Sequence, residues 1–571
     1  MKPILKLTIF VVAVGLLCAT GAFAQQVTPP PSQFAITGFI QEARLNPNVG
    51  GSIPADPRLY GGTLTVNGIK MIVPNNSIIQ MPATSMTWAD LFDPAKSQSV
   101  GYTPPRPNHR PGVTGLALAD NQLAGTRAAA ASPPMPYPSY EVSVNGNVLP
   151  DGRYVVGLIV PVEQQVLNGT GGLINYIDYA TGRFRVGGIR GNPTTGTLCE
   201  INDPVGRFGL PHSPDPRFTC DYTNPTITTS TGYPVGIPNV APPLSDPDRP
   251  LTNRPLNNPG SVDPNQPFSP FLQTGAPLRT FTMPASAGPG TTTPDPYKQV
   301  PLMVGDWVDF AGTVFKINPL GPNTAANTFV SIYSLTAHMS VKTTPGTVPA
   351  YVRVEEMLFG VGDGAGGPTV NAGVPATPIT QETGTHVAMV SFLTDSNPAL
   401  VPPNPALPTG RILGIYVDPV TGGETEFQFP NGNGGGATPN PDFAIDDSVR
   451  GRLLWRTAKN PKPAVAGLLG NAVNAAPPPV PLRNFYREYI LKISTGQLQL
   501  PPQANGLPGL IAGQYRFPIF EYIFGEGVVF GQPVPPNNYN NFGFLAVGSG
   551  PLNGPGTGAP LIGRLDPWPQ P

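Results

Sequence analysis

The sequence predicts an all-β protein built from several small antiparallel sandwich or OB-like barrel modules, joined by long Pro/Gly-rich loops. First, the 571 residues include 67 Gly and 78 Pro, and both residue types are poor in helix interiors. Second, short alternating apolar and polar segments recur between turn residues, which is typical of strands. Third, 39% of the residues are hydrophobic and the net charge is −1, whereas disordered chains combine low hydrophobicity with high charge.

Residues 1–24 predict a secretory signal peptide. Lys2 and Lys6 precede the uncharged run 7–17, and Ala22-Phe23-Ala24 offers the small residues that signal peptidase needs before Gln25. As a helix, that run spans about 16 Å, short of the ~30 Å hydrocarbon core of a bilayer. We therefore expect an exported protein with no transmembrane anchor after cleavage, located in the periplasm, on the outer surface or in the medium. Lipidation of Cys18 stays open, although the preceding leucines match a lipoprotein signal poorly.

Two Asn-Gly pairs mark the first strands after the signal. Asn67-Gly68 lies between strand-like segments 64–66 and 69–73 and predicts a type I′ hairpin, because both turn residues tolerate positive φ. Asn145-Gly146 follows 142–144 in the same way. Short helical segments are expected only at 86–92 and 464–476. Further strands are expected within 174–186, 329–335, 351–359, 387–393, 412–429, 485–493 and 517–530.

A weak internal similarity suggests a repeated barrel. Gly38, Gly172 and Gly312 each begin a strand-like segment that is followed by a second alternating segment. Glycine allows the coiled first strand of a small Greek-key or OB-like barrel to bend. Because the spacing is irregular, generic sandwiches remain the alternative.

The composition divides the chain into modules. Residues 234–297 are dense in proline, which favours an extended, semi-rigid linker. The predicted order is a signal peptide (1–24), a β module with a Pro-rich loop (25–135), a second β module (136–233), the linker (234–297), a third β module (298–430) and a C-terminal β-rich module (431–571).

Cys199 and Cys220 remain after signal cleavage. An even pair of cysteines in an exported chain predicts a disulfide. Closing a loop of about 20 residues would contribute roughly 3 kcal/mol by restricting the unfolded chain. A reactive thiol pair is the alternative, but the spacing is not Cys-x-x-Cys.

Charge and motifs argue against several classes of function. Charged residues make up 12% of the chain, so no basic surface for nucleic acid or anionic lipid is expected. The chain lacks a Gly-x-Ser-x-Gly nucleophile elbow, a Gly-Lys-Ser/Thr phosphate loop and a Cys-x-x-Cys-His haem motif. A catalytic triad assembled from distant residues stays open.

No cofactor is expected, with calcium as the alternative. His109, His212, His338 and His386 are isolated in the sequence, which speaks against a transition-metal site. For calcium, the candidates are the glycine-rich loop 360–367 with Asp363 and the pair Asp446-Asp447. Neither has the alternating acidic ligands of a calcium loop.

The best enzyme hypothesis is glycoside hydrolysis by paired carboxylates. Carboxylates and aromatic residues occur together on strand-like segments, where aromatic rings would stack on sugars. The competing interpretation is that these rings fill the core. The candidates are Glu355, Glu356, Glu488, Glu521 and Glu526, with Tyr486, Tyr489, Tyr515, Phe520 and Tyr522.

The sequence favours an exported, non-enzymatic surface, matrix or assembly protein that acts through binding or structural interactions. An extracellular polysaccharide-binding protein or glycoside hydrolase is the alternative. The expected partners are other surface proteins, further copies of the chain added strand to strand, or polysaccharide. Nucleic acid is not an expected partner.

Overall fold

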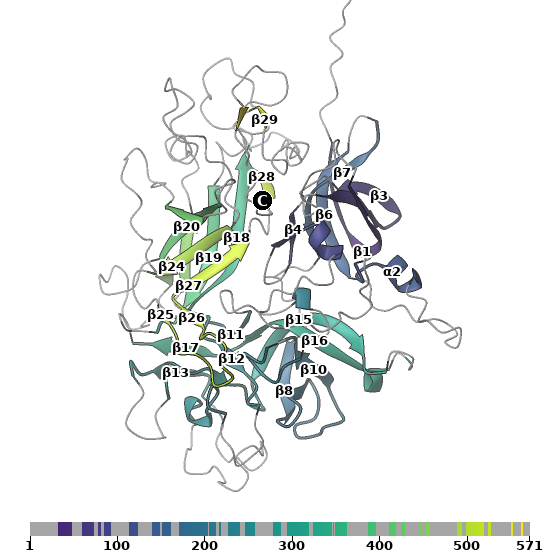
Figure 1. The fold of residues 1–571 in the computed structure, drawn as a ribbon. Helices are drawn as coiled ribbons and strands as arrows, with labels where there is room; N and C mark the ends of the chain where they lie inside the picture. The colour runs from purple at the N-terminus through teal and green to yellow at the C-terminus, as the bar shows by residue number, and fades with distance from the viewer. Residues whose placement is uncertain are drawn as a thin grey trace, which may run out of the picture.

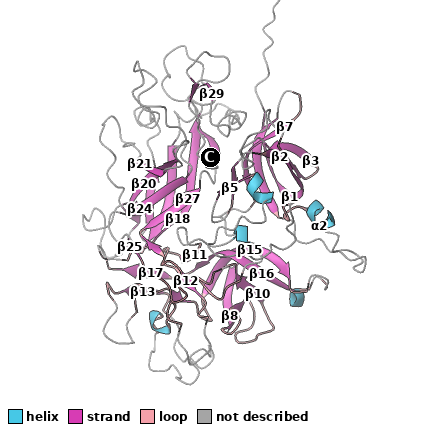
Figure 2. Cartoon of the chain, in the orientation of Figure 1, coloured by secondary structure: helices cyan, strands magenta, loops and turns pink. Residues whose placement is uncertain are grey.

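The structure is a computed structural model in which strands dominate the described residues (Figure 2). No helix in these residues is long and apolar enough to cross a bilayer. The structure describes residues 32–47, 60–73, 78–81, 85–92, 114–123, 140–148, 151–161, 171–203, 205–212, 216–218, 226–239, 246–256, 278–286, 294–318, 322, 324–344, 347, 349–362, 386–394, 410–417, 424–428, 445–447, 452–456, 488–493, 498–518, 523–526, 550–551 and 561–562.

The first module is a closed five-stranded barrel. Strands β1–β2, β2–β3, β1–β6 and β6–β7 pair antiparallel, and a parallel β3–β7 pairing closes the barrel. This Greek-key connectivity is that of an OB-like barrel. The strands are β1 (Ser32–Asn46), β2 (Gly61–Val66), β3 (Ile69–Val73), β6 (Glu141–Val148) and β7 (Tyr154–Val160).

Local sequence explains how this barrel turns. Asn67 and Gly68 have φ values of 50° and 77°, so the predicted type I′ hairpin is confirmed. The turn predicted at Asn145-Gly146 is wrong, because this pair lies inside strand β6, where it forms a bulge against β7. The side-chain amide of Asn67 donates to the carbonyl oxygen of Thr37 at 3.0 Å, which ties the hairpin to β1. Strand β1 has a bulge between Ile40 and Glu42, where it passes from pairing with β6 to pairing with β2. Bulges increase twist and allow one strand to serve two sides of a barrel.

Small elements extend the first barrel. Strands β4 (Ile78–Gln80) and β5 (Ser85–Thr87) add to β7, and the 3-10 helix η2 (Ala89–Phe92) follows them. The helical turn predicted over 86–92 is thus realised only in its second half. The short helix α2 (Leu118–Leu123) lies before β6.

The second module repeats the same connectivity. Antiparallel pairings join β8–β9, β9–β10, β8–β15 and β15–β16, and a parallel β10–β16 pairing closes the barrel. The strands are β8 (Gly171–Asp178), β9 (Arg183–Val186), β10 (Thr197–Ile201), β15 (Trp307–Lys316) and β16 (Thr328–Ala337); β11 (Ile227–Thr229) extends β16.

Two of the three glycine-led segments therefore lie in the first strand of a barrel. Gly38 lies in β1 and Gly172 in β8, the first strands of the two barrels. Gly312 lies in β15, the fourth strand of the second barrel, beside a bulge at Ala311/Gly312. The glycine at 312 thus accompanies a bend inside an existing barrel and does not open a third one.

The module boundaries that follow from strand pairing differ from those predicted from composition. The predicted boundary at 135/136 falls inside the first barrel, because β6 pairs with β1. The second barrel takes β8–β10 from the predicted module 136–233 and β15–β16 from 298–430. Barrel closure, which brings distant strands together, decides these memberships.

The described parts of 234–297 contain buried, paired strands where a linker was expected. Val235 and Met283 have no exposed side-chain surface. Strands β12 (Val235–Gly236) and β13 (Thr280–Met283) pair in parallel with β14 (Val300–Pro301) and β17 (Ser340–Thr343). The extended backbone that proline favours is used here for strand pairing.

The two barrels pack against each other through one shared core. Phe218 and Tyr333 are buried in the same hydrophobic cluster as the interior of the first barrel. The rings of Tyr140 and Phe218 stack with centroids 4.6 Å apart. The buried guanidinium of Arg217 donates to the carbonyl oxygen of Leu91 at 3.2 Å.

The C-terminal part forms further sheets, drawn in green and yellow in Figure 1. One has the order β22-β23-β19-β18-β28 and the other β21-β20-β24-β27, while β25 and β26 form a hairpin. These strands and a last pair are β18 (Val352–Gly362), β19 (His386–Leu393), β20 (Gly410–Val417), β21 (Glu424–Gln428), β22 (Ile445–Asp447), β23 (Arg452–Arg456), β24 (Glu488–Ile493), β25 (Leu498–Gln499), β26 (Ile511–Ala512), β27 (Gln514–Pro518), β28 (Ile523–Glu526), β29 (Gly550–Pro551) and β30 (Leu561–Ile562). The predicted helix at 464–476 lies outside the described residues.

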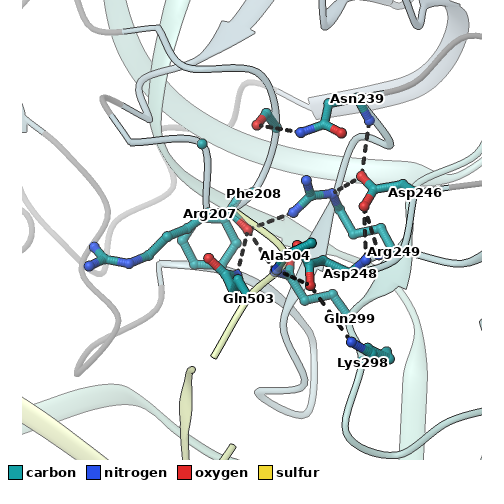
Figure 3. Close-up of polar contacts among 12 residues, drawn as sticks. Arg207, Phe208, Asn239, Asp246, Asp248, Arg249, Lys298, Gln299, Gln503 and Ala504 are labelled. Atoms are coloured by element: carbon teal, nitrogen blue, oxygen red, sulfur yellow. Dashed lines mark hydrogen bonds and ion pairs between the residues drawn. The ribbon is translucent and has the colours of Figure 1, made fainter. Parts of the chain in front are cut away.

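A buried polar network joins the second barrel to the C-terminal hairpin (Figure 3). The carbonyl oxygen of Arg207 accepts hydrogen bonds from Arg249 at 2.7 Å, Gln299 at 2.6 Å and Gln503 at 3.2 Å. Arg249 also pairs with Asp246 at 2.9 Å, and the side chains of both are only 1% exposed. Because four hydrogen bonds and ion pairs of this network lie away from water, the network fixes loops that have little regular structure.

Candidate functional site

A cavity of about 320 Å³ lies on the second barrel. This volume is at the small end of the range for ligand pockets. Side chains of β9 and β10 form one side of the cavity, and the loop after β10 forms the other. The lining residues are Thr181, Gly182, Arg183, Glu200, Ile201, Gly209, Leu210, Pro211 and His212.

The side chains of Arg183, Glu200 and His212 meet in this cavity, which we call the Glu200 pocket. Cys199 pairs with Phe184, so one step along the antiparallel register Glu200 lies opposite Arg183. Arg183 forms an ion pair with one carboxylate oxygen of Glu200 through its Nε atom. The Nε2 atom of His212 lies 2.7 Å from the other oxygen.

The environment of Glu200 keeps its carboxylate charged. Burial by itself raises the pKa of this carboxyl, but the contacts with His212 and Arg183 outweigh burial and lower the pKa below its ordinary value. The side chain of Glu200 is 6% exposed, against 41% for Arg183 and 32% for His212. The carboxylate thus lies behind the two basic groups.

Asp203 shapes the loop that carries His212. Its buried carboxylate accepts the backbone N–H of Phe208 at 2.6 Å and that of Gly209 at 3.0 Å. The backbone N–H of His212 donates to the carbonyl oxygen of Asp203 at 2.7 Å, which closes the loop. Burial raises the pKa of Asp203, despite the hydrogen bonds that favour its charged form.

The turn between β8 and β9 forms the rim of the pocket that faces Leu210. The carboxylate of Asp178 accepts the N–H of Ala180 at 3.0 Å and the hydroxyl of Thr181 at 2.8 Å. Gly182 has a φ of 72°, which disfavours any residue with a Cβ atom. A Cβ there would also lie 3.3 Å from Leu210, so glycine allows the two rims to approach.

Aromatic rings hold His212 from behind. The rings of His212 and Phe329 meet edge to face, with centroids 5.7 Å apart. Phe329 stacks in turn on Phe315 with centroids 5.9 Å apart. The imidazole is therefore held between an aromatic pair and a carboxylate, and the pocket is preformed.

The structure describes only one of the two cysteines predicted to form a disulfide. Cys199 carries a free thiol with no exposed surface and lies in the core of the second barrel. Its Sγ atom is 3.6 Å from the carbonyl oxygen of Thr197, and burial raises the pKa of the thiol above its ordinary value. Strand alternation directs Cys199 inward and the next residue outward, which spacing between cysteines could not reveal. Cys220 lies outside the described residues.

The histidines occupy different environments. His212 lines the pocket, and His338 forms an ion pair with Asp309 on β15. His386 begins β19, whereas His109 lies outside the described residues. Within the described part of the chain, no three His, Cys, Asp or Glu side chains form a group that could hold a metal ion.

The two candidate calcium-binding segments differ in where the structure places them. Asp446 and Asp447 lie in strand β22 and not in a loop. Residues 360–362 of the glycine-rich segment belong to β18. Asp363 and the rest of that segment lie outside the described residues.

The carboxylates proposed for glycoside chemistry are divided between two sheets. Glu355, Glu356 and Glu526 belong to β18 and β28 of one sheet, and Glu488 belongs to β24 of the other. Tyr489 also lies in β24, and Tyr515 in β27 is 4% exposed, as a core residue would be. The candidates outside the described residues are Glu521, Tyr486, Phe520 and Tyr522.

Sequence reasoning missed Arg183 and Glu200. The available signal was the presence of charged residues in two short strand-like segments, 183–186 and 197–201. That signal gains meaning only once the two strands are known to be neighbours. No known protein family, curated protein sequence or solved structure matches this chain.

Proposed function

We propose that this is an exported, non-enzymatic multi-module protein of a surface, matrix or assembly, and that its second barrel binds a ligand in the Glu200 pocket. The observation that carries the proposal is the pocket itself. Arg183 and His212 stand over a buried carboxylate that holds both of them. Such preorganised polar groups around a cavity are typical of recognition sites.

The charge state of Glu200 favours binding over acid catalysis. A general acid for glycoside hydrolysis needs a raised pKa so that it holds a proton near neutral pH. The pKa of Glu200 is lowered instead, because His212 and Arg183 stabilise the carboxylate. Glu200 is therefore suited to orienting basic groups and not to donating a proton.

Polysaccharide binding is the second candidate. The pocket lies beside β9 and β10 and the β8–β9 turn, the equivalents of the second and third strands and first loop of an OB barrel. OB barrels use this face and this loop for oligonucleotides and oligosaccharides. With 12% charged residues and a net charge of −1, the chain is better suited to saccharides.

Export rests on the signal at residues 1–24. We expect the chain to be processed before Gln25 and recovered outside the cytoplasm. N-terminal sequencing of the purified protein, after cell fractionation, tests this. An unprocessed chain found in the cytoplasm would contradict it.

A paired screen tests binding against catalysis. The mature protein is applied to a glycan array, and the same glycans are then analysed for hydrolysis products. We expect binding without hydrolysis, with binding reduced in a Gly209→Val variant. Gly209 lines the pocket, and a Cβ there would lie more than 4 Å from any atom other than those of its chain neighbours, so we expect valine to narrow the cavity without displacing its surroundings. Hydrolysis that Glu200→Gln abolishes would overturn the non-enzymatic assignment.

A further inference from the structure

We propose that the Glu200 pocket recognises a sugar that carries a carboxylate group. This inference rests on the proposed binding function and names the ligand class for the same site. It follows from which charged groups the pocket presents to solvent.

The pocket presents hydrogen-bond donors and conceals its acceptor. Arg183 and His212 are 41% and 32% exposed, whereas Glu200 is 6% exposed and lies behind them. The Nε2 atom of His212 is itself buried against Glu200, so an entering ligand meets the guanidinium of Arg183 before the carboxylate. A ligand rich in acceptors suits this surface, and an ammonium group is repelled by it.

Arg183 gives the pocket its preference for an anion. Its guanidinium pairs with the carboxylate of Glu200 through Nε, and it is the more exposed partner of this pair. Arginine also binds carboxylates with a planar fork of donors, which adds geometric selectivity.

The size and remaining lining suit a sugar ring. The cavity of about 320 Å³ is at the small end for ligand pockets. Leu210 and Pro211 provide apolar surface on one rim. The Thr181 hydroxyl donates to Asp178 and accepts the backbone N–H of Arg183, which leaves one lone pair to accept from a sugar hydroxyl. A ring with C–H faces, hydroxyls and one carboxylate matches this combination.

Calorimetric titration of the full mature chain tests the proposal. The probes are glucuronate, a galacturonate trimer, glucose and inorganic phosphate. We expect glucuronate to bind at least tenfold more tightly than glucose, as one charge-assisted hydrogen bond allows. If the carboxylate comes from a polymer, the trimer binds more tightly than glucuronate; if it comes from a free sugar acid, it does not.

Four variants assign the binding to the pocket. Arg183→Gln is expected to weaken glucuronate binding by roughly 10- to 100-fold and to remove the preference over glucose. Gly209→Val is expected to weaken binding of both sugars by filling the cavity. Arg153→Gln, which removes an exposed arginine paired with Asp151, is the matched control and should leave binding unchanged.

The fourth variant, Glu200→Gln, distinguishes two modes of binding. In one, the pocket recognises an anion; in the other, the carboxylate of Glu200 binds hydroxyls or cations. If the pocket recognises anions, this variant removes the negative charge beside Arg183 and the preference for glucuronate over glucose increases. If Glu200 itself contacts the ligand, the preference is lost. Circular dichroism and a urea titration verify that each variant is folded before its binding is interpreted.

Each contrary result has a distinct meaning. Equal binding of glucuronate and glucose that Gly209→Val weakens would overturn the ligand class and leave the binding function standing. Phosphate binding through Arg183 without sugar binding would also overturn the ligand class. If none of the probes binds and the glycan array is blank as well, both the inference and the binding function fail.

Discussion

The carboxylate of Asp248 accepts the backbone N–H of Ala504 through both oxygens, at 3.1 and 3.0 Å, across 256 residues of chain. Leu510, in the same hairpin, is 2% exposed within the core of the second barrel. The segment 498–512 is therefore part of the second barrel's packing, although the sequence places it in the C-terminal module.

Asp248→Ala should loosen this hairpin. The substitution leaves the Ala504 N–H without its acceptor and removes the contact with Lys298 at 3.7 Å. We expect a loss of about 1–3 kcal/mol in the free energy of unfolding, with faster hydrogen exchange at residues 498–512. Asp151→Ala, at an exposed ion pair, is the control and should leave exchange at the hairpin unchanged. Unaltered exchange in Asp248→Ala would show that the contact does not hold the hairpin.

Arg254 and Asp306 form a buried pair that should be strongly coupled. Their side chains are 0% and 3% exposed, and Arg254 donates to both carboxylate oxygens of Asp306. Arg254→Met or Asp306→Asn alone should cost about 3–5 kcal/mol, because each leaves a buried group without its partner. Urea unfolding of both single variants and the double variant gives the coupling free energy. Strictly additive effects would rule the coupling out.

The Glu200 ion pairs make stability depend on pH. The pKa of Glu200 is lower in the folded chain than the ordinary value of 4.5, so its contribution is complete above that value. It is lost as pH falls through the folded pKa, because the protonated carboxyl no longer attracts Arg183 and His212. We expect Glu200→Gln to cost about 1–3 kcal/mol at pH 7 and progressively less in urea titrations below pH 4.5. A difference that is constant between pH 7 and pH 3 would contradict this.

Cys199 should behave as an inert thiol in the native protein. It has no exposed surface, and burial raises its pKa above the ordinary value, so the reactive thiolate is scarce. In a Cys220→Ser variant of the mature chain, a thiol reagent should react slowly in buffer and rapidly with one thiol in denaturant. If the wild-type mature chain shows no free thiol in denaturant without reductant, the cysteines are paired after all.

The parts of the fold that sequence predicted are those that short segments encode. The Asn67-Gly68 hairpin needs only two residues with positive φ, and the structure has both. Strand alternation at 64–66 and 69–73 was sufficient to find β2 and β3. Gly38 and Gly172 indicated the first strands of both barrels, because the need for a bend is also local.

The site depended on pairing that no short segment encodes. Arg183 and Glu200 are neighbours because β9 and β10 pair, and His212 reaches them because Asp203 closes its loop. In sequence, His212 was an isolated histidine and Cys199 one half of an expected disulfide. The direction in which each side chain points from its strand separated the buried thiol from the pocket carboxylate.

By itself, the sequence determined the strand-rich class, the turn at Asn67-Gly68 and the low charge of this chain, since backbone preference and composition act locally. The tertiary structure alone decided which strands close each barrel, that described parts of 234–297 are buried, and that a hairpin near residue 504 completes a core begun before residue 200. The physical reason is that burial and ion pairing depend on which surfaces meet. That is a property of the packed chain and of no single segment.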